Sequence, residues 1–292
     1  MLKLKSLILV FAIFFTSSKA LASDLEIYSA ESVQEINNSL MELLAKRNAT
    51  KTLLLLSMDA MIESSNPVFR TSDESLQRLA ARSFKKVKHS RKSYLDELLL
   101  AEYENRLSDD DWVSLVKNTQ KLKVPIIVTT QNVSGSFNKI SHLEVWSWSY
   151  LQKLGIDLSQ GFFNDKQIIF NKHDTKVKGT YPTFYRGLLS CNSSARENTT
   201  NVILSGLLVR YLKWFPDVVY VVDEDEDYIK SLAKQLKVLK KDVQIVGFVY
   251  SKAESQEEVD PKLVAKTWDD VVKKLNQVSR AENKNKEDPY EQ

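Results

Sequence analysis

The chain has little of what many enzyme classes need. It has one cysteine, Cys191, among 292 residues, so no intramolecular disulfide can form and stability must come from the apolar core. We predict a buried, unreactive thiol at this position. The seven glycines stand too far apart for a glycine-rich phosphate-binding loop. The histidines, His89, His142 and His173, do not have the spacing of zinc ligands. No Ser-His-Asp arrangement with a nucleophile elbow is present either.

Long apolar runs are also missing beyond the first residues. The N-terminus reads MLKLK, then SLILVFAIFF, then SSKALA, which is the charged, apolar and small-residue order of a secretory signal. We predict that residues 1–22 are cleaved and that the protein is exported, to a periplasm or outside the cell. A retained anchor is the alternative, but the apolar run is shorter than the ~20 residues that a spanning helix needs. No membrane association is expected after cleavage.

An excess of one charge is absent from the mature chain. Residues 1–22 carry three lysines and no acid, so their removal leaves 38 basic and 38 acidic side chains. This balance gives no support to nucleic-acid binding. The remaining length suits one α/β domain, which we place at residues 23–280. The tail, residues 281–292, is charged and almost without apolar side chains, so we expect disorder there.

Three apolar segments stand out in this domain, and each ends in polar side chains. They are Thr52–Leu56, Val124–Val128 and Val218–Val222. Such runs are typical of central strands in a parallel sheet, whose carboxyl ends form the ligand-binding edge of open α/β folds. We therefore predict a three-layer α/β/α fold in which three strand ends meet at one crevice.

Segments with helical periodicity lie before, between and after the three apolar segments. Segments 29–47, 229–239 and 260–278 are amphipathic, and Pro261 suits the first turn of the last one. Leu143 to Leu154 also repeats as a helix does, while 168–170 and 185–189 are predicted as short strands. Residues 62–110 form a long charged region with helical spacing. Its basic stretch KKVKHSRK is either a phosphate-facing patch or, as we prefer, a solvated helix surface.

The polar residues after the three strands resemble a known family. The first strand is followed by Ser57-x-Asp59-x-Met61, the second by Thr129, and the third by Asp223 and Glu224. This order resembles the haloacid-dehalogenase-like phosphohydrolases, whose first motif is DxDxT or DxDxV, and more closely a secreted branch of unknown function. The resemblance covers about residues 45–255 and implies a Rossmann-like parallel sheet with a mostly helical cap inserted at about 62–110.

The resemblance also implies roles for single residues. Ser57 matches the nucleophilic aspartate, Asp59 the general acid/base, and Thr129 the hydroxyl that holds phosphoryl oxygens. Asp59, Asp223 and Glu224 match the magnesium ligands. The motif lysine is missing near residues 199–201, where Arg196 is the nearest cation. A serine is a far poorer nucleophile than a carboxylate unless a base activates it.

Three hypotheses follow. The first is an exported pseudo-phosphatase that binds an unknown protein or a phosphorylated small ligand and has no resident cofactor. The second is a magnesium-dependent phosphohydrolase with serine at the nucleophile position, which uses an activated water. The third is an unrelated exported α/β protein whose strand ends match the motifs by chance. We prefer the first, because Ser57 stands at the position of the nucleophilic aspartate and the motif lysine is missing.

Overall fold

The computed structural model describes residues 25–45, 48–71, 73–170, 180–192, 203–252 and 258–278. The predicted signal and tail lie outside these ranges, and so do His173 and Arg196. Among the described residues, we find no helix whose length and apolar character would suffice to cross a bilayer.

The three apolar segments form neighbouring parallel strands. They are β2 (Thr52–Ser57), β5 (Ile126–Thr130) and β9 (Val218–Asp223), and every residue in them is buried. β2 lies in the middle and pairs with β5 on one side and with β9 on the other. A strand buried on both faces needs continuous apolar sequence rather than alternation, which is why these segments could be predicted.

An eight-stranded sheet extends from these three strands, in the order β1-β10-β9-β2-β5-β8-β7-β6. The further strands are β1 (Leu25–Ala30), β10 (Gln244–Tyr250), β8 (Leu188–Ser190), β7 (Thr183–Tyr185) and β6 (Gln167–Ile169). The pairing is parallel from β1 to β8 and antiparallel from β8 to β6.

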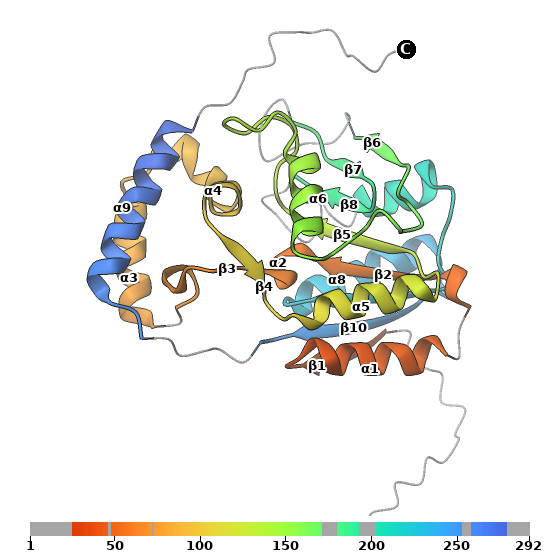
Figure 1. Ribbon diagram of the computed structural model, residues 1–292. Helices are drawn as coiled ribbons and strands as arrows, with labels where there is room; N and C mark the ends of the chain where they lie inside the picture. The colour runs from red at the N-terminus through yellow and green to blue at the C-terminus, as the bar shows by residue number, and fades with distance from the viewer. Residues whose placement is uncertain are drawn as a thin grey trace, which may run out of the picture.

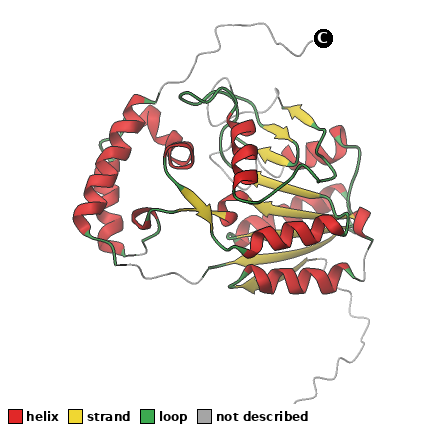
Figure 2. Ribbon diagram, in the orientation of Figure 1, coloured by secondary structure: helices red, strands yellow, loops and turns green. Residues whose placement is uncertain are grey.

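Helices cover both faces of the sheet (Figure 2). One face buries apolar side chains of α1 (Val33–Leu44), α5 (Asp111–Lys121) and α6 (Leu143–Lys153). The other face packs against α8 (Glu226–Leu239) and the helical segment 203–211, which ends in a π-helical turn. The predicted three-layer α/β/α architecture is confirmed.

A helical group lies beside the sheet, on the side toward which β2 runs (Figure 1). The chain leaves the sheet through α2 (Met58–Met61) and β3 (Ile62–Ser64). It returns through β4 (Asn105–Leu107), which pairs antiparallel with β3. Between these strands lie the 3₁₀ turns Pro67–Phe69 and His89–Tyr94 and the helices α3 (Glu74–Phe84) and α4 (Leu95–Glu102). These elements fall within the region 62–110 that was predicted to be a helical cap.

The C-terminal helix also belongs to this group, and this placement could not be predicted from the sequence. α9 (Pro261–Gln277) starts at an Asp260 cap with Pro261 in the first turn, as predicted, and packs against α3. The Trp268 ring meets those of Phe69 and Phe84 edge-on, at 5.7 and 6.2 Å between centroids. Two segments about 190 residues apart thus share one core.

One sequence prediction was wrong in detail, and one strand was missed. Residues 185–189 were predicted as one strand, but Arg186 and Gly187 have positive φ angles, 49° and 93°, and turn the chain between β7 and β8. Positive φ at both central positions is the geometry of a tight hairpin turn. Strand β1 was not predicted, because its burial is partial at the sheet edge. Cys191 is fully buried, as expected.

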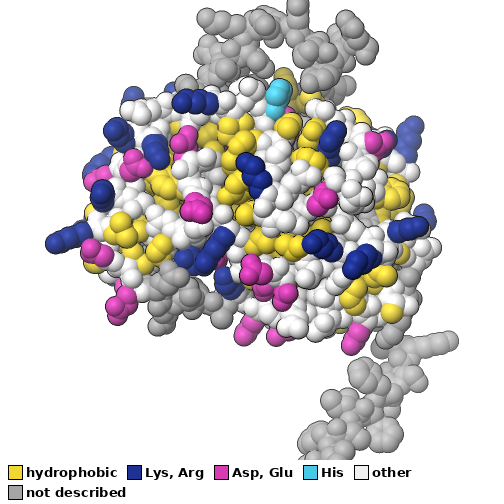
Figure 3. Space-filling view, in the orientation of Figure 1, with side chains coloured by type: hydrophobic (Ala, Val, Ile, Leu, Met, Phe, Trp, Pro, Cys, Tyr) yellow, Lys and Arg dark blue, Asp and Glu magenta, His cyan; other side chains and the backbone are white. Residues whose placement is uncertain are grey.

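Acidic and basic side chains are interspersed over the face shown in Figure 3, with apolar patches between them. No broad area of a single charge covers this face.

Candidate functional site

Three of the predicted site residues lie in one row across the sheet. Ser57, the last residue of β2, is in register with Thr129 of β5. On the other side Leu56 is in register with Val222, so the next residue along β9, Asp223, is the neighbour of Ser57. Residues in register on parallel strands point to the same face of the sheet. The row Thr129–Ser57–Asp223, which we call the strand-end row, therefore places two hydroxyls and a carboxylate side by side.

The strand-end row is almost fully buried. The exposed fractions of Ser57, Thr129 and Asp223 are 3%, 6% and 1%. The Thr129 hydroxyl donates to the Leu56 carbonyl at 3.5 Å, and Asp223 Oδ1 accepts the Asp225 backbone N–H at 2.9 Å. Buried polar groups such as these are costly unless they are hydrogen-bonded, and these bonds offset part of that cost.

The other two predicted residues lie differently. Asp59 and Glu224 are exposed, while Met58, Ala60 and Met61 around Asp59 are buried. The reason is local: helix α2 begins directly after Ser57, so the chain turns and residue 59 no longer follows strand alternation. The spacing Ser-x-Asp alone could not show this turn.

The described carboxylates do not make a metal site. Within the described ranges no group of three His, Cys, Asp or Glu side chains is arranged to hold a metal ion. The predicted set, Asp59, Asp223 and Glu224, combines one buried and two exposed carboxylates. The positions near the missing lysine lie outside the described residues.

The loop after β5 is held by two buried carboxylates that the sequence did not single out. Glu97 of α4, which is fully buried, accepts the Val133 backbone N–H at 3.0 Å. Glu144 of α6, 5% exposed, accepts the Gly135 N–H at 2.7 Å. Glu97 thus links the helical group to the loop that directly follows the Thr129 strand.

Side-chain amides and hydroxyls fix the same loop from the β8 side. Asn192 accepts the Ser134 backbone N–H at 2.6 Å, and Thr183 donates to the Ser134 hydroxyl at 3.2 Å. The Ser134 hydroxyl also donates to the Tyr181 carbonyl. Asn192 has a φ angle of 52°, a left-handed conformation in which asparagine is enriched among non-glycine residues. Such a fully bonded buried network rigidifies the backbone next to the strand-end row.

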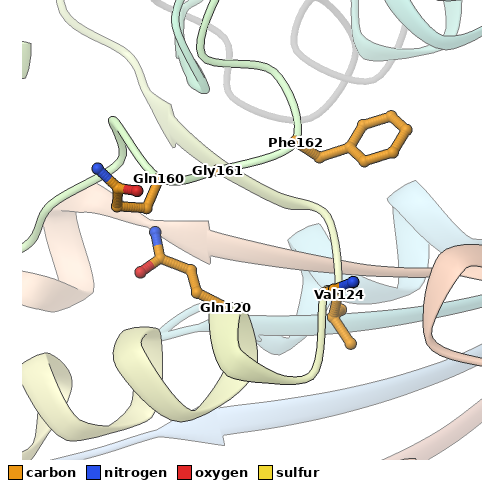
Figure 4. A pocket seen from close by; sticks show the side chains of 6 residues that line it. Gln120, Val124, Gln160, Gly161 and Phe162 are labelled. Atoms are coloured by element: carbon orange, nitrogen blue, oxygen red, sulfur yellow. The ribbon is translucent and has the colours of Figure 1, made fainter.

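A small hollow lies at the opposite end of β5 (Figure 4). Its volume is about 200 Å³, and its walls come from the segments 120–124 and 160–162. Gln120 already donates to the Asp157 carbonyl at 2.7 Å. Ligands of open α/β sheets bind at the carboxyl ends of the strands, so this hollow at the amino end is separate from the strand-end row.

The fold and the site together define the class of this protein: it is an α/β protein with a buried row of polar side chains at the ends of its parallel strands. The chain belongs to the family described as protein of unknown function (DUF2608), whose model matches residues 29–281. The expected membership in a family of unknown function is therefore confirmed.

Relatives occur in Rickettsia. An uncharacterized protein of Rickettsia felis is 26% identical over 262 residues, which is 87% of this chain and 87% of the relative. Uncharacterized protein RT0286 of Rickettsia typhi is 29% identical over 196 residues, 66% of this chain and 64% of the relative. Among solved structures, the chain is similar to the HAD domain of effector protein Lem4 from Legionella pneumophila, with 13% identity, a TM-score of 0.34 and coverage of 79% of this chain and 96% of that one.

Proposed function

We propose that this protein is an exported, haloacid-dehalogenase-like pseudo-phosphatase, which keeps a strand-end site for binding but lacks phosphatase activity. One observation carries the proposal: at the end of the central strand, between Thr129 and Asp223, stands a buried serine hydroxyl. The resemblance places the attacking carboxylate of the phosphatases at this position. Its ligand, on this account, is a phosphorylated small molecule or a partner protein.

The serine is poorly equipped to replace the carboxylate. A serine hydroxyl attacks only when a neighbouring base takes its proton, and histidine is the commonest such base. The two described histidines, His89 and His142, are exposed and belong to the helical group and to the start of α6. Within the described ranges no group of three His, Cys, Asp or Glu side chains is arranged to hold a metal ion, which supports a site without the metal partner that phosphoryl transfer usually has.

Phosphate release from p-nitrophenyl phosphate tests the proposal directly. We expect the mature chain to give the same rate as a blank, with and without magnesium, and Ser57→Ala and Asp59→Asn to leave that rate unchanged. Loss of a catalytic group costs roughly 10⁴ to 10⁶ in rate in well-studied hydrolases. A site that attacks through Ser57 would therefore show a large drop in Ser57→Ala, and one that uses an activated water would show it in Asp59→Asn.

Calorimetric titration with magnesium provides the control for the metal. We expect no heat of binding beyond dilution. Steady phosphate release that needs magnesium and disappears in Asp59→Asn would overturn the proposal and support the magnesium-dependent phosphohydrolase instead.

A further inference from the structure

The hollow at the amino end of β5 combines apolar walls with amide groups. Its polar walls are Gln120 and Lys123, at and just beyond the end of α5, and Gln160, in the loop after α6. Val124 and Phe162 supply apolar walls. In Figure 4 the two glutamine side chains stand at one end of the hollow, and the Phe162 ring extends from the other end, away from them. Apolar surface with a few polar groups is the usual composition of a small-molecule site.

The volume of the hollow, about 200 Å³, limits the size of the ligand. A cavity of about 150 Å³ in another protein is large enough for benzene, so this hollow has room for a single ring of that size. Specific protein partners bury about 800 Å² on each side, which a hollow of this size does not offer. The occupant that fits is a small molecule or one ring of a longer molecule.

The open polar atoms of the walls decide the chemistry of the ligand. Gln120 Nε2 donates to the Asp157 carbonyl at 2.7 Å, and Gln160 Nε2 donates to the Ser159 hydroxyl at 3.3 Å. Within the described part of the chain, the oxygens of both amides accept no hydrogen bond, and the Lys123 ammonium donates none. A hydroxyl group both donates and accepts, whereas a carboxylate cannot donate to the amides and a second cation is repelled by the lysine. The walls therefore favour a neutral ligand with several hydroxyl groups.

Phe162 adds a flat apolar surface beside the hollow. The residue is 56% exposed. Its ring lies 6.1 Å from the Trp214 ring, tilted by 36°, and 5.1 Å from the Phe163 ring, which stands edge-on. Trp214 is held in turn by the hydrogen bond from its Nε1 to the Thr50 carbonyl at 3.2 Å. The face of an aromatic ring carries partial negative charge, which attracts the C–H groups on one face of a sugar ring.

The loop 157–164, which carries half of the walls, is held by its own hydrogen bonds. Asp157 Oδ1 accepts the Ser159 N–H at 2.8 Å and the Gln152 amide at 3.2 Å. The Asn164 amide donates to the Ser159 carbonyl at 2.8 Å. A site that is ordered before its ligand arrives loses less conformational entropy on binding. The walls of the hollow are therefore in place without a ligand.

We propose that the hollow binds one ring of a neutral sugar chain, and that Phe162 packs against the neighbouring ring. The amide oxygens of Gln120 and Gln160 accept hydrogen bonds from the sugar hydroxyls, and the Lys123 ammonium donates to one of them. Because the Phe162 ring extends away from the glutamines, it covers the adjoining sugar rather than the one in the hollow. The site shares no residue with the strand-end row and does not depend on Ser57, so it extends beyond the proposed function.

Calorimetric titration of the mature chain with maltotriose, cellotriose and tri-N-acetylchitotriose tests this proposal. We expect at least one of these neutral sugars to bind in the millimolar range or more tightly. Phe162→Ala should bind it about fivefold more weakly, because one aromatic stacking contact is lost. Gln160→Ala should bind it about threefold more weakly, because one hydrogen bond is lost. The affinity should not change as sodium chloride is raised, since the ligand carries no charge.

Tyr28→Ala is the matched control. Tyr28 is an aromatic residue of the edge strand β1 and is 46% exposed, and its replacement should leave the sugar affinity unchanged. Should Phe162→Ala fail to fold, Phe162→Leu supplies the test, because it keeps an apolar side chain and removes the ring. The proposal is overturned if none of the three sugars binds, or if either the Phe162 variant or Gln160→Ala binds as tightly as wild type. Loss of binding in Ser57→Ala with unchanged binding in the Phe162 variant would also contradict it and place the sugar at the strand-end row.

Discussion

Replacing Trp112 with alanine is expected to lower the free energy of unfolding by about 3–5 kcal/mol, the range for a large aromatic residue removed from a core. Trp112 is the largest fully buried side chain described. Its ring meets the Tyr250 ring edge-on at 5.4 Å, and its Nε1 donates to the Ser108 hydroxyl at 2.9 Å. Ser108 in turn donates to the Ala60 carbonyl at 2.7 Å. One ring thus joins α5, the residue that follows β4, α2 and β10.

Urea denaturation followed by far-ultraviolet circular dichroism measures this loss as a shift of the midpoint. Trp112→Phe is the control, because it keeps most of the ring and removes only the hydrogen bond to Ser108. Its expected cost is near the ~1 kcal/mol of a single hydrogen bond plus a small cavity. A Trp112→Ala protein as stable as Trp112→Phe would show that the ring does not hold these elements together.

Replacing Glu97 with alanine is expected to lower the free energy of unfolding by about 2–4 kcal/mol. The change leaves the buried Val133 N–H without this acceptor, which costs about 1–3 kcal/mol, and it opens a cavity in addition. Glu97 is fully buried, although it lies in a helix of the charged region. Hydrogen exchange adds a local measurement: amides in the loop 131–142 should exchange faster in Glu97→Ala than in wild type, with a larger increase than those of strand β9.

Glu97→Gln and Glu104→Ala are the controls for this prediction. Glutamine keeps an acceptor oxygen and should cost less than alanine, while Glu104 is exposed and its removal should be nearly neutral. If the loop exchanged equally in Glu97→Ala and in wild type, the view that Glu97 of α4 holds the loop after β5 would be refuted.

The centre of the sheet could be predicted from sequence because its signal is local. A continuous apolar run followed by polar residues marks a buried parallel strand and its carboxyl end, as in β2, β5 and β9. Parallel strands that pair side by side must align these ends, so Ser57, Thr129 and Asp223 were expected together, and the register places them in one row.

The environment of the strand-end row could not be predicted, because it depends on contacts between distant segments. Glu97 lies 36 residues from Val133. In sequence it is one more charge in a charged region, for which a solvated position is the better default. Asp59 is exposed for a local reason, since helix α2 begins directly after Ser57.

The central claim is that Thr129, Ser57 and Asp223 face one site, and a double-cysteine variant tests it most directly. Ser57→Cys with Thr129→Cys would place two thiolates on adjacent strands in register, next to the Asp223 carboxylate. Thiolates are soft ligands that bind cadmium strongly when two converge on the ion. Cadmium titration, followed by the thiolate-to-metal absorption band, should show one ion per chain, bound roughly 100-fold more tightly than by either single variant. A double variant that binds cadmium no better than the single variants would contradict the row on which this account rests.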